Sequence, residues 1–135
     1  MTETASPEIT AQQRGALVLR NLLSAGFGDT LKWATWSEPG RAGVELHTLY
    51  TTDAPQQAAA YLIRYTPGAH GDRHEHLGYE MIFVLDGELV INDTERYGRG
   101  DLIIEPPGSV HQVTSETGFL VLAVREAPTA PRPTG

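Results

Sequence analysis

The stretch "PGAHGDRHEHLGYEMIFVLDGEL", residues 67–89, decides what fold and what chemistry are expected of this chain. Three of the five histidines, His70, His74 and His76, fall within seven positions, and an apolar run follows directly. Side chains alternate between two faces along a strand, so His74 and His76 point the same way. Glu80 shares their parity if the strand continues, although a bulge would re-aim its carboxylate. Two imidazoles and a carboxylate on one face form a ligand set for a transition-metal ion.

Strand-length runs rich in Val, Ile, Leu, Thr and aromatic residues extend on both sides of this stretch. Segments rich in Gly and Pro, such as "EPGRAG", "YGRGD" and "PPGS", separate them. This pattern predicts an all-β sandwich or barrel. The runs are residues 31–37, 44–52, 59–66, 79–87, 88–93, 101–105, 111–115 and 119–126.

One helix is predicted near the N-terminus, over about residues 11–25. Thr10 and Gln13 form a capping-box pattern, and Gly26 suits a C-terminal stop, whereas Gly15 disfavours a helix. The chain is therefore expected to have four parts. These are a flexible N-terminus (1–10), the helix and its lead-in (11–30), the barrel (31–126) and a Pro-rich disordered tail (127–135).

Composition excludes several classes of function. The chain has 135 residues, enough for one domain with its own core. A net charge of −7 without a basic patch argues against a nucleic-acid partner. The absence of cysteine excludes disulfides and cysteine-ligated zinc modules. Because there is no leader pattern and no apolar run of membrane-spanning length, we expect a cytoplasmic protein without membrane contact.

The run "MIFVL" is apolar on both faces of its strand. Ile82 and Val84 share one face, and Met81, Phe83 and Leu85 share the other. An antiparallel strand with two apolar faces needs a cover on both, which the N-terminal helix or a symmetric second subunit would supply. A homodimer is the expectation, and ordinary core strands in a monomer are the alternative.

At this point the sequence resembles the cupins. Their first motif, G-x5-H-x-H-x3,4-E-x6-G, runs here through Gly68, His74, His76, Glu80 and Gly87 with every spacing in place. Their second motif, G-x5-P-x-G-x2-H-x3-N, matches in a separate set of positions. These are Gly100, Pro106, Gly108 and His111, with Ser115 standing where Asn is usual.

The resemblance implies an RmlC-like jelly-roll β-barrel with a metal site in its mouth. Carried over residue by residue, the metal ligands would be His74, His76, Glu80 and His111. The resemblance leaves two octahedral positions for water, substrate or dioxygen, and Fe(II) is favoured over Zn, Mn, Ni or Co. Gly87 is interpreted as part of a hairpin turn.

A narrower likeness concerns the "PGA" lead, the "PPGSVH" turn and the tryptophan-containing opening at residues 33–49. These three stretches are similar to the cupin half of ChrR-type anti-sigma factors and to small dioxygenases that cleave diketones. An anti-sigma role would need a Cys- and His-bearing zinc module, which this chain lacks. The leading expectation is an Fe(II)-type oxygenase acting on a small carbonyl or phenolic substrate, with Glu80 as the catalytic proton acceptor. The alternatives are a non-redox metal lyase or isomerase and a non-catalytic metal- or ligand-binding cupin.

Further pocket residues are predicted from their position in the strands. Tyr61, Arg64, Tyr65 and Gln112 are candidates to contact a small-molecule substrate, and Arg64 would either anchor an anion inside the barrel or extend outward. His47, His70 and Glu105 are interpreted as surface residues.

Overall fold

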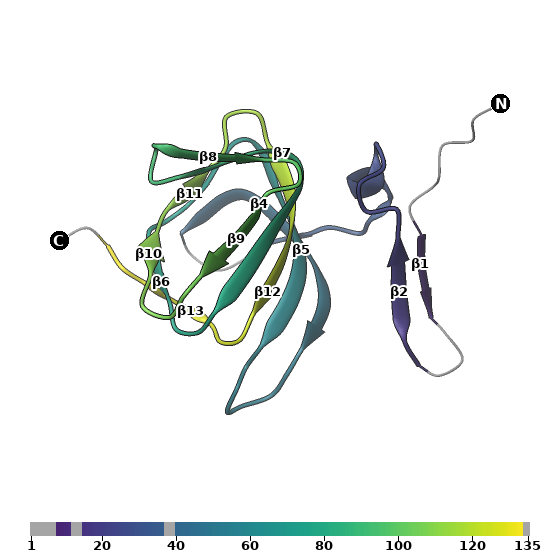
Figure 1. Cartoon of the computed structure of the whole chain (residues 1–135), viewed down its shortest axis with the longest axis horizontal. Coiled ribbons are helices and arrows are strands. Elements are labelled where there is room, and N and C mark those ends of the chain that lie inside the picture. The colour runs from purple at the N-terminus through teal and green to yellow at the C-terminus, as the bar shows by residue number, and fades with distance from the viewer. Residues whose placement is uncertain (1–7, 12–14, 37–39, 134–135) are drawn as a thin grey trace. The chain divides into compact units, whose positions relative to one another are not determined.

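The computed structural model describes residues 8–11, 15–36 and 40–133, and the chain divides into two compact units, residues 1–32 and 33–135 (Figure 1). Both units are built from β-strands. No helix in the described part of the chain is long and apolar enough to cross a membrane.

The first unit is a β-hairpin followed by one short helical turn. Strand β1 (Glu8–Ala11) pairs antiparallel with β2 (Leu17–Arg20), and the 3-10 helix η1 covers Phe27–Thr30. The helix predicted over residues 11–25 is therefore wrong for the described residues, where β2 lies, and residues 12–14 of that prediction fall outside the described part of the chain. Gly15 has φ +87°, a left-handed conformation that a helix interior does not contain, so the chain turns there instead of continuing a helix.

The second unit contains the remaining strands, and the prediction of an all-β barrel is confirmed. Most of the observed strands overlap the predicted runs. They are β3 (Ala34–Thr35), β4 (Arg41–Thr51), β5 (Ala59–Gly71), β6 (His74–His76), β7 (Glu80–Ile91), β8 (Glu95–Gly98), β9 (Leu102–Glu105), β10 (Val110–His111), β11 (Val113–Thr114), β12 (Phe119–Arg125) and β13 (Thr129–Pro131).

Strand pairing closes these elements into a barrel (Figure 1). The larger sheet has the order β11-β7-β12-β5-β4-β3, with β8 and β9 also paired to β7. Because β11 pairs with both β7 and β5, the strands β7, β12, β5 and β11 form a closed ring of neighbours. A smaller sheet, β10-β6-β13, carries the histidine-rich segment.

Alternating apolar residues of several strands fill the barrel core. Ile82 and Val84 of β7 pack with Val121 of β12 and with the stacked rings of Tyr65 and Phe119, whose centroids lie 4.3 Å apart. One face of "MIFVL" is thus buried as its alternation predicts.

Strand β7 continues through the segment that was expected to turn. Gly87 lies inside β7 and not in a hairpin turn, and the β7–β12 register shifts between Leu120 and Val121. Gly87 has φ +80°, and a Cβ at this position would lie 2.2 Å from the Gly118 carbonyl oxygen. The glycine therefore permits a close approach of two strands at a bulge.

The predicted disordered tail contains a strand. Thr129, Ala130 and Pro131 form β13 and pair with His76, Glu75 and His74 of β6. Pro131 is tolerated because β13 is an edge strand, where not every backbone N–H needs a partner.

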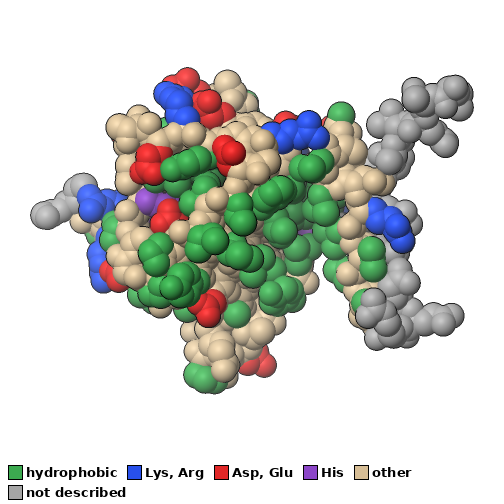
Figure 2. Space-filling view, viewed as in Figure 1, with side chains coloured by type: hydrophobic (Ala, Val, Ile, Leu, Met, Phe, Trp, Pro, Cys, Tyr) green, Lys and Arg blue, Asp and Glu red, His purple; other side chains and the backbone are tan. Residues whose placement is uncertain are grey.

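An apolar surface lies on the outer face of β7 and β9. In register, Met81 faces Ile104 and Phe83 faces Leu102, and we call these four residues the β7–β9 face. Met81, Leu102 and Ile104 are exposed by 45%, 53% and 56%. Figure 2 shows hydrophobic side chains gathered over these strands.

Candidate metal centre

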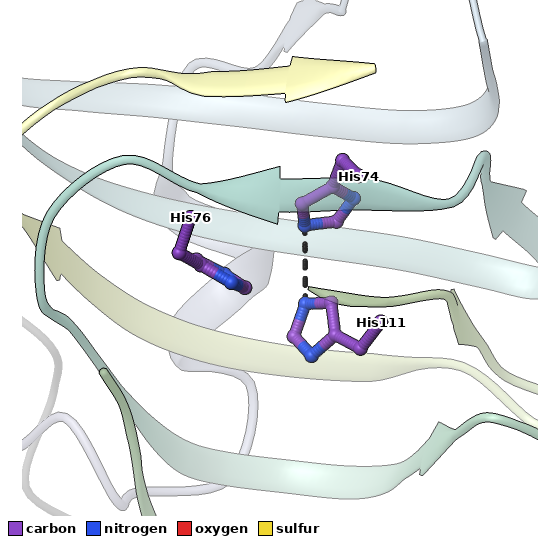
Figure 3. Close-up of side chains that lie close together, drawn as sticks. All are labelled: His74, His76 and His111. Atoms are coloured by element: carbon purple, nitrogen blue, oxygen red, sulfur yellow. Dashed lines mark hydrogen bonds between the residues drawn. The ribbon is translucent and has the colours of Figure 1, made fainter. Parts of the chain in front are cut away.

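Three histidines from two neighbouring strands meet inside the second unit (Figure 3). His74 and His76 lie on β6, two residues apart and on one face, and His111 lies on β10 directly opposite His74. All three are buried, and their ligand nitrogens lie within 4.8 Å of one another. The three histidines of the predicted ligand set are therefore brought together by the β6–β10 pairing.

Backbone acceptors fix the protonation of both β6 histidines. The Nδ1 of His74 lies 3.0 Å from the carbonyl oxygen of Asp72, and the Nδ1 of His76 lies 3.2 Å from that of Ser109. A carbonyl oxygen only accepts hydrogen bonds, so each Nδ1 carries the proton and donates it. In the neutral ring of His74, Nε2 is then left with a lone pair, and it lies 3.1 Å from the Nε2 of His111.

The third histidine is held by a carboxylate. His111 Nδ1 donates to Glu105 Oε1 at 3.0 Å, and its Nε2 lies 3.1 Å from the Nε2 of His74 (Figure 3). Two lone pairs that face each other at this distance repel unless a proton or a metal ion lies between them. Burial lowers the pKa of His74, and burial together with the neighbouring His74 charge lowers that of His111 to about 3, which disfavours the proton. The donor set therefore fits a metal cation.

Glu80, the fourth predicted ligand, lies beside the histidines. It begins β7, and its Oε1 lies 2.9 Å from His76 Nε2. Burial lowers the pKa of His76, but the hydrogen bond and charge of Glu80 outweigh burial, and the net shift is upward. The carboxylate is thus placed to complete a three-histidine, one-glutamate set.

Glu105 was interpreted from the sequence as a surface residue, but in the structure it positions His111. It ends β9 immediately before the Pro-Pro-Gly turn, and its carboxylate reaches back to His111. A carboxylate bonded to the outer nitrogen of a ligating histidine fixes the ring and raises its basicity. The same turn brings the Ser109 hydroxyl to 3.1 Å from His76 Nδ1.

Ser115, the one departure from the second motif, is buried, and its hydroxyl forms two hydrogen bonds. Its hydroxyl donates to the carbonyl of Glu88 at 2.7 Å and accepts from the N–H of Gly118 at 2.9 Å. A serine hydroxyl therefore ties this loop together where the cupin pattern has Asn.

A cavity of about 60 Å³ adjoins the histidines. His74, His111 and Glu80 form one part of its lining, and apolar side chains including Val44, Ile82 and Val121 form another. Four larger polar or aromatic side chains also line it, namely Trp36, Arg41, Tyr65 and Arg125. Burial raises the pKa of Tyr65 to about 12, so this phenol stays protonated at neutral pH.

The other predicted pocket residues lie outside the cavity lining. Arg64 forms an ion pair with Glu45 at 2.9 Å and stacks on Trp33, with its guanidinium carbon 4.5 Å from the ring centroid. Tyr61 lies next to the cavity, where its ring contacts the lining residue Trp36 at a centroid distance of 6.1 Å. Gln112 donates its backbone N–H to the side chain of Asn92.

The remaining two histidines do not join the cluster. His70 is exposed on β5, and His47 lies half-buried on β4 opposite Leu62. Neither belongs to the group of residues that can hold a metal ion in the described part of the chain.

Sequence interpretation missed Arg41 and Arg125. The signal for Arg125 is present in "FLVLAVR", because Phe119, Val121, Ala123 and Arg125 alternate along β12 and all line the cavity. The sequence alone does not say which face of β12 is internal. For Arg41 we find no comparable signal.

A family model described as the ChrR cupin-like domain matches residues 27–129. The complex of SigE with the anti-sigma factor ChrR from Rhodobacter sphaeroides contains a similar chain, with 28% identity and a TM-score of 0.58. The match covers 72% of this chain and 49% of that one, so this chain spans about half of its length. None of the curated proteins matches the chain.

Two further solved structures share the fold. A putative acetylacetone dioxygenase from Methylibium petroleiphilum has a TM-score of 0.70 and 12% identity, and the match covers 78% of each chain. The polyketide cyclase RemF from Streptomyces resistomycificus has a TM-score of 0.61 and 24% identity, with coverage of 79% of this chain and 83% of its own.

Proposed function

The chain belongs to the ChrR cupin-like domain family, and on that premise we propose that it is a metal-dependent oxygenase. Its substrate would be a small carbonyl or phenolic compound that binds beside the metal in the barrel. One observation carries the proposal: His74, His76 and His111 are buried and place one ligand nitrogen each within 4.8 Å of the others.

The residues that would hold the ion are the three histidines and Glu80. Three imidazoles and one carboxylate suit Fe(II), and they also accept Zn, Mn, Ni or Co. A bound Fe(II) ion would supply Lewis acidity toward a substrate oxygen and redox chemistry with dioxygen as the second substrate.

The protein's own groups define the rest of the reaction. Glu80 is the proposed proton acceptor, because its carboxylate lines the cavity and is only 2.9 Å from His76 Nε2. The apolar wall would contact the carbon skeleton of the substrate, and the protonated Tyr65 hydroxyl would supply a hydrogen-bond donor beside it.

Metal content and oxygen uptake test this proposal together. The protein, purified without added metal, is analysed for its elements, then reconstituted anaerobically with Fe(II) and mixed with acetylacetone or catechol in an oxygen electrode. We expect about one iron per chain and oxygen consumption that depends on the substrate. Iron binding without uptake for any carbonyl or phenolic compound contradicts the oxygenase.

A second function uses the same ligand set without redox chemistry. Zinc suits three histidines and a carboxylate, and it would favour a lyase, an isomerase or a non-catalytic ligand-binding protein. One tightly bound zinc per chain, unaffected by iron reconstitution, would favour this second candidate over the first.

A further inference from the structure

Arg125 contributes a positive charge to the cavity, and it forms no ion pair with any of the described residues. It ends β12 and lies directly opposite Glu80 of β7, on the same face of the sheet. Its Nε is buried and has no hydrogen-bond partner among the described residues. Among the described residues its guanidinium contacts Tyr61: Nη2 donates a long hydrogen bond of 3.4 Å to the hydroxyl oxygen, and the guanidinium carbon lies 5.3 Å from the ring centroid.

Arg41 contributes a second such charge from β4. Its guanidinium carbon lies 5.0 Å from the Trp36 ring centroid, and its Nη1 reaches a backbone carbonyl at 3.5 Å. A Cβ on Gly71 would lie 3.2 Å from this Nη1 and 2.8 Å from the Tyr65 hydroxyl oxygen. Because Gly71 has no Cβ, there is space beside the cavity for the Arg41 guanidinium and the Tyr65 hydroxyl.

Three other arginines of the second unit have carboxylate partners. Arg64, Arg96 and Arg132 each lie within 2.9 Å of a glutamate oxygen. In the described part of the chain neither Arg41 nor Arg125 forms an ion pair. A guanidinium in a largely apolar cavity costs free energy unless an anion accompanies it.

Trp36 adds a neutral donor to the same wall. Its indole Nε1 is buried without a hydrogen-bond partner among the described residues, and the residue lines the cavity. An indole N–H only donates, so it needs an acceptor. Two buried N–H groups at this cavity, Arg125 Nε and Trp36 Nε1, thus lack acceptors among the described residues, and neither arginine has an anionic partner there.

We propose that this cavity binds a small organic oxyanion. Arg41, Arg125 and the Trp36 N–H donate hydrogen bonds to its negatively charged oxygens. The inference rests on the proposed function, because the oxyanion is the substrate held next to the metal. A cavity of about 60 Å³ has room for several water-sized groups, so the ligand is a small molecule.

Charge discrimination between two ligands of equal size tests the inference. Acetoacetate and its neutral analogue acetoacetamide are titrated into isotopically labelled protein at constant ionic strength, and binding is followed by NMR shifts. The titration is made on metal-free and on zinc-loaded protein. We expect acetoacetate to bind at least tenfold more tightly than the amide in both forms.

Arginine variants identify the groups responsible. R41Q and R125Q are each expected to reduce the preference for acetoacetate at least fivefold, whereas R96Q, which removes an exposed arginine paired with Glu88, leaves it within twofold. Equal binding of the two ligands by the wild-type protein overturns the inference without any variant. A preference that survives both R41Q and R125Q also overturns it.

The metal-free titration separates this inference from the proposed function. Anion preference in metal-free protein that binds no metal on reconstitution supports the oxyanion site and contradicts only the metal-dependent reaction. Full metal stoichiometry without anion preference overturns the oxyanion site alone.

Discussion

The position of one proton on each histidine ring decides what the cluster can bind. His74, His76 and His111 all donate from Nδ1, to two carbonyls and one carboxylate, and so all present Nε2 inward. Two backbone carbonyls and the Glu105 side chain thereby orient the three rings in the absence of an ion.

Removal of single ligands tests this residue-level arrangement. We expect His74→Ala and His111→Ala to abolish stoichiometric metal binding, because each variant removes one of three converging nitrogens. Elemental analysis after reconstitution and desalting measures the outcome. His70→Ala, which changes an exposed histidine outside the cluster, should keep the wild-type metal content. Full metal retention in both ligand variants would show that the site lies elsewhere.

Glu105 is expected to influence metal affinity without binding the ion. Glu105→Ala should raise the Kd for zinc about 10–100-fold, since His111 loses the acceptor that orients its ring. Glu105→Gln keeps an acceptor oxygen and should have a smaller effect. Competition with a chromophoric chelator measures both. Glu75→Gln is the matched control, because Glu75 pairs with Arg132 instead of a histidine; an equal effect in this control would contradict the positioning role.

Among the elements, β6 decides whether the site exists. This three-residue strand holds two ligands and lies between β10 and β13 in its sheet. Isolated short strands have little stability of their own, so both neighbours are needed to hold the two imidazoles in register.

Truncation tests the contribution of β13. Removal of residues 127–135 deletes the β13–β6 pairing, and the free energy of unfolding should fall by about 2 kcal/mol at roughly 1 kcal/mol per lost hydrogen bond. Zinc affinity should fall with it. Thermal unfolding and chelator competition measure the two effects. A truncation after Arg132 keeps β13 and should behave as wild type; unchanged stability in the longer truncation would show that β13 contributes nothing.

The bulge in β7 predicts a second element-level effect. Gly87→Ala should lower the free energy of unfolding by about 3 kcal/mol or more, because a Cβ adds a clash with Gly118 to the cost of positive φ. Gly100→Ala has the same type of φ but no neighbour within 4 Å, so it should cost only about 1 kcal/mol. Chemical denaturation measures both, and equal losses would contradict the close approach.

At the scale of the whole molecule, the β7–β9 face bears on assembly. Its four members are uncharged, so a second copy related by a two-fold axis would bury them without leaving a charge unpaired. The homodimer expected from the sequence stays a prediction. Light scattering should give a dimer for the wild type and a monomer for Ile104→Glu, whereas Gln56→Glu, a charge added on an exposed loop, should stay dimeric. A monomeric wild type would rule the dimer out.

The sequence by itself determined the all-β class and the pairing of His74 with His76 on one face, because alternation is a local property of a strand. The barrel and His111 came from the resemblance of its two motifs to those of the cupins. Sequence interpretation failed at residues 11–25, where apolar spacing suited a helix but Gly15 takes a left-handed turn, and at residues 129–131, where only pairing with β6 makes a strand.

The tertiary structure alone decided which side of each strand faces the cavity. Alternation separates Arg64 from Ile63 and Tyr65, and it groups Arg125 with Val121, but it does not say which group is internal. That choice depends on how strands far apart in the sequence pair and curve around one interior. For the same reason Glu105 contacts His111 only in the folded chain, and only there do Arg41 and Arg125 line one cavity.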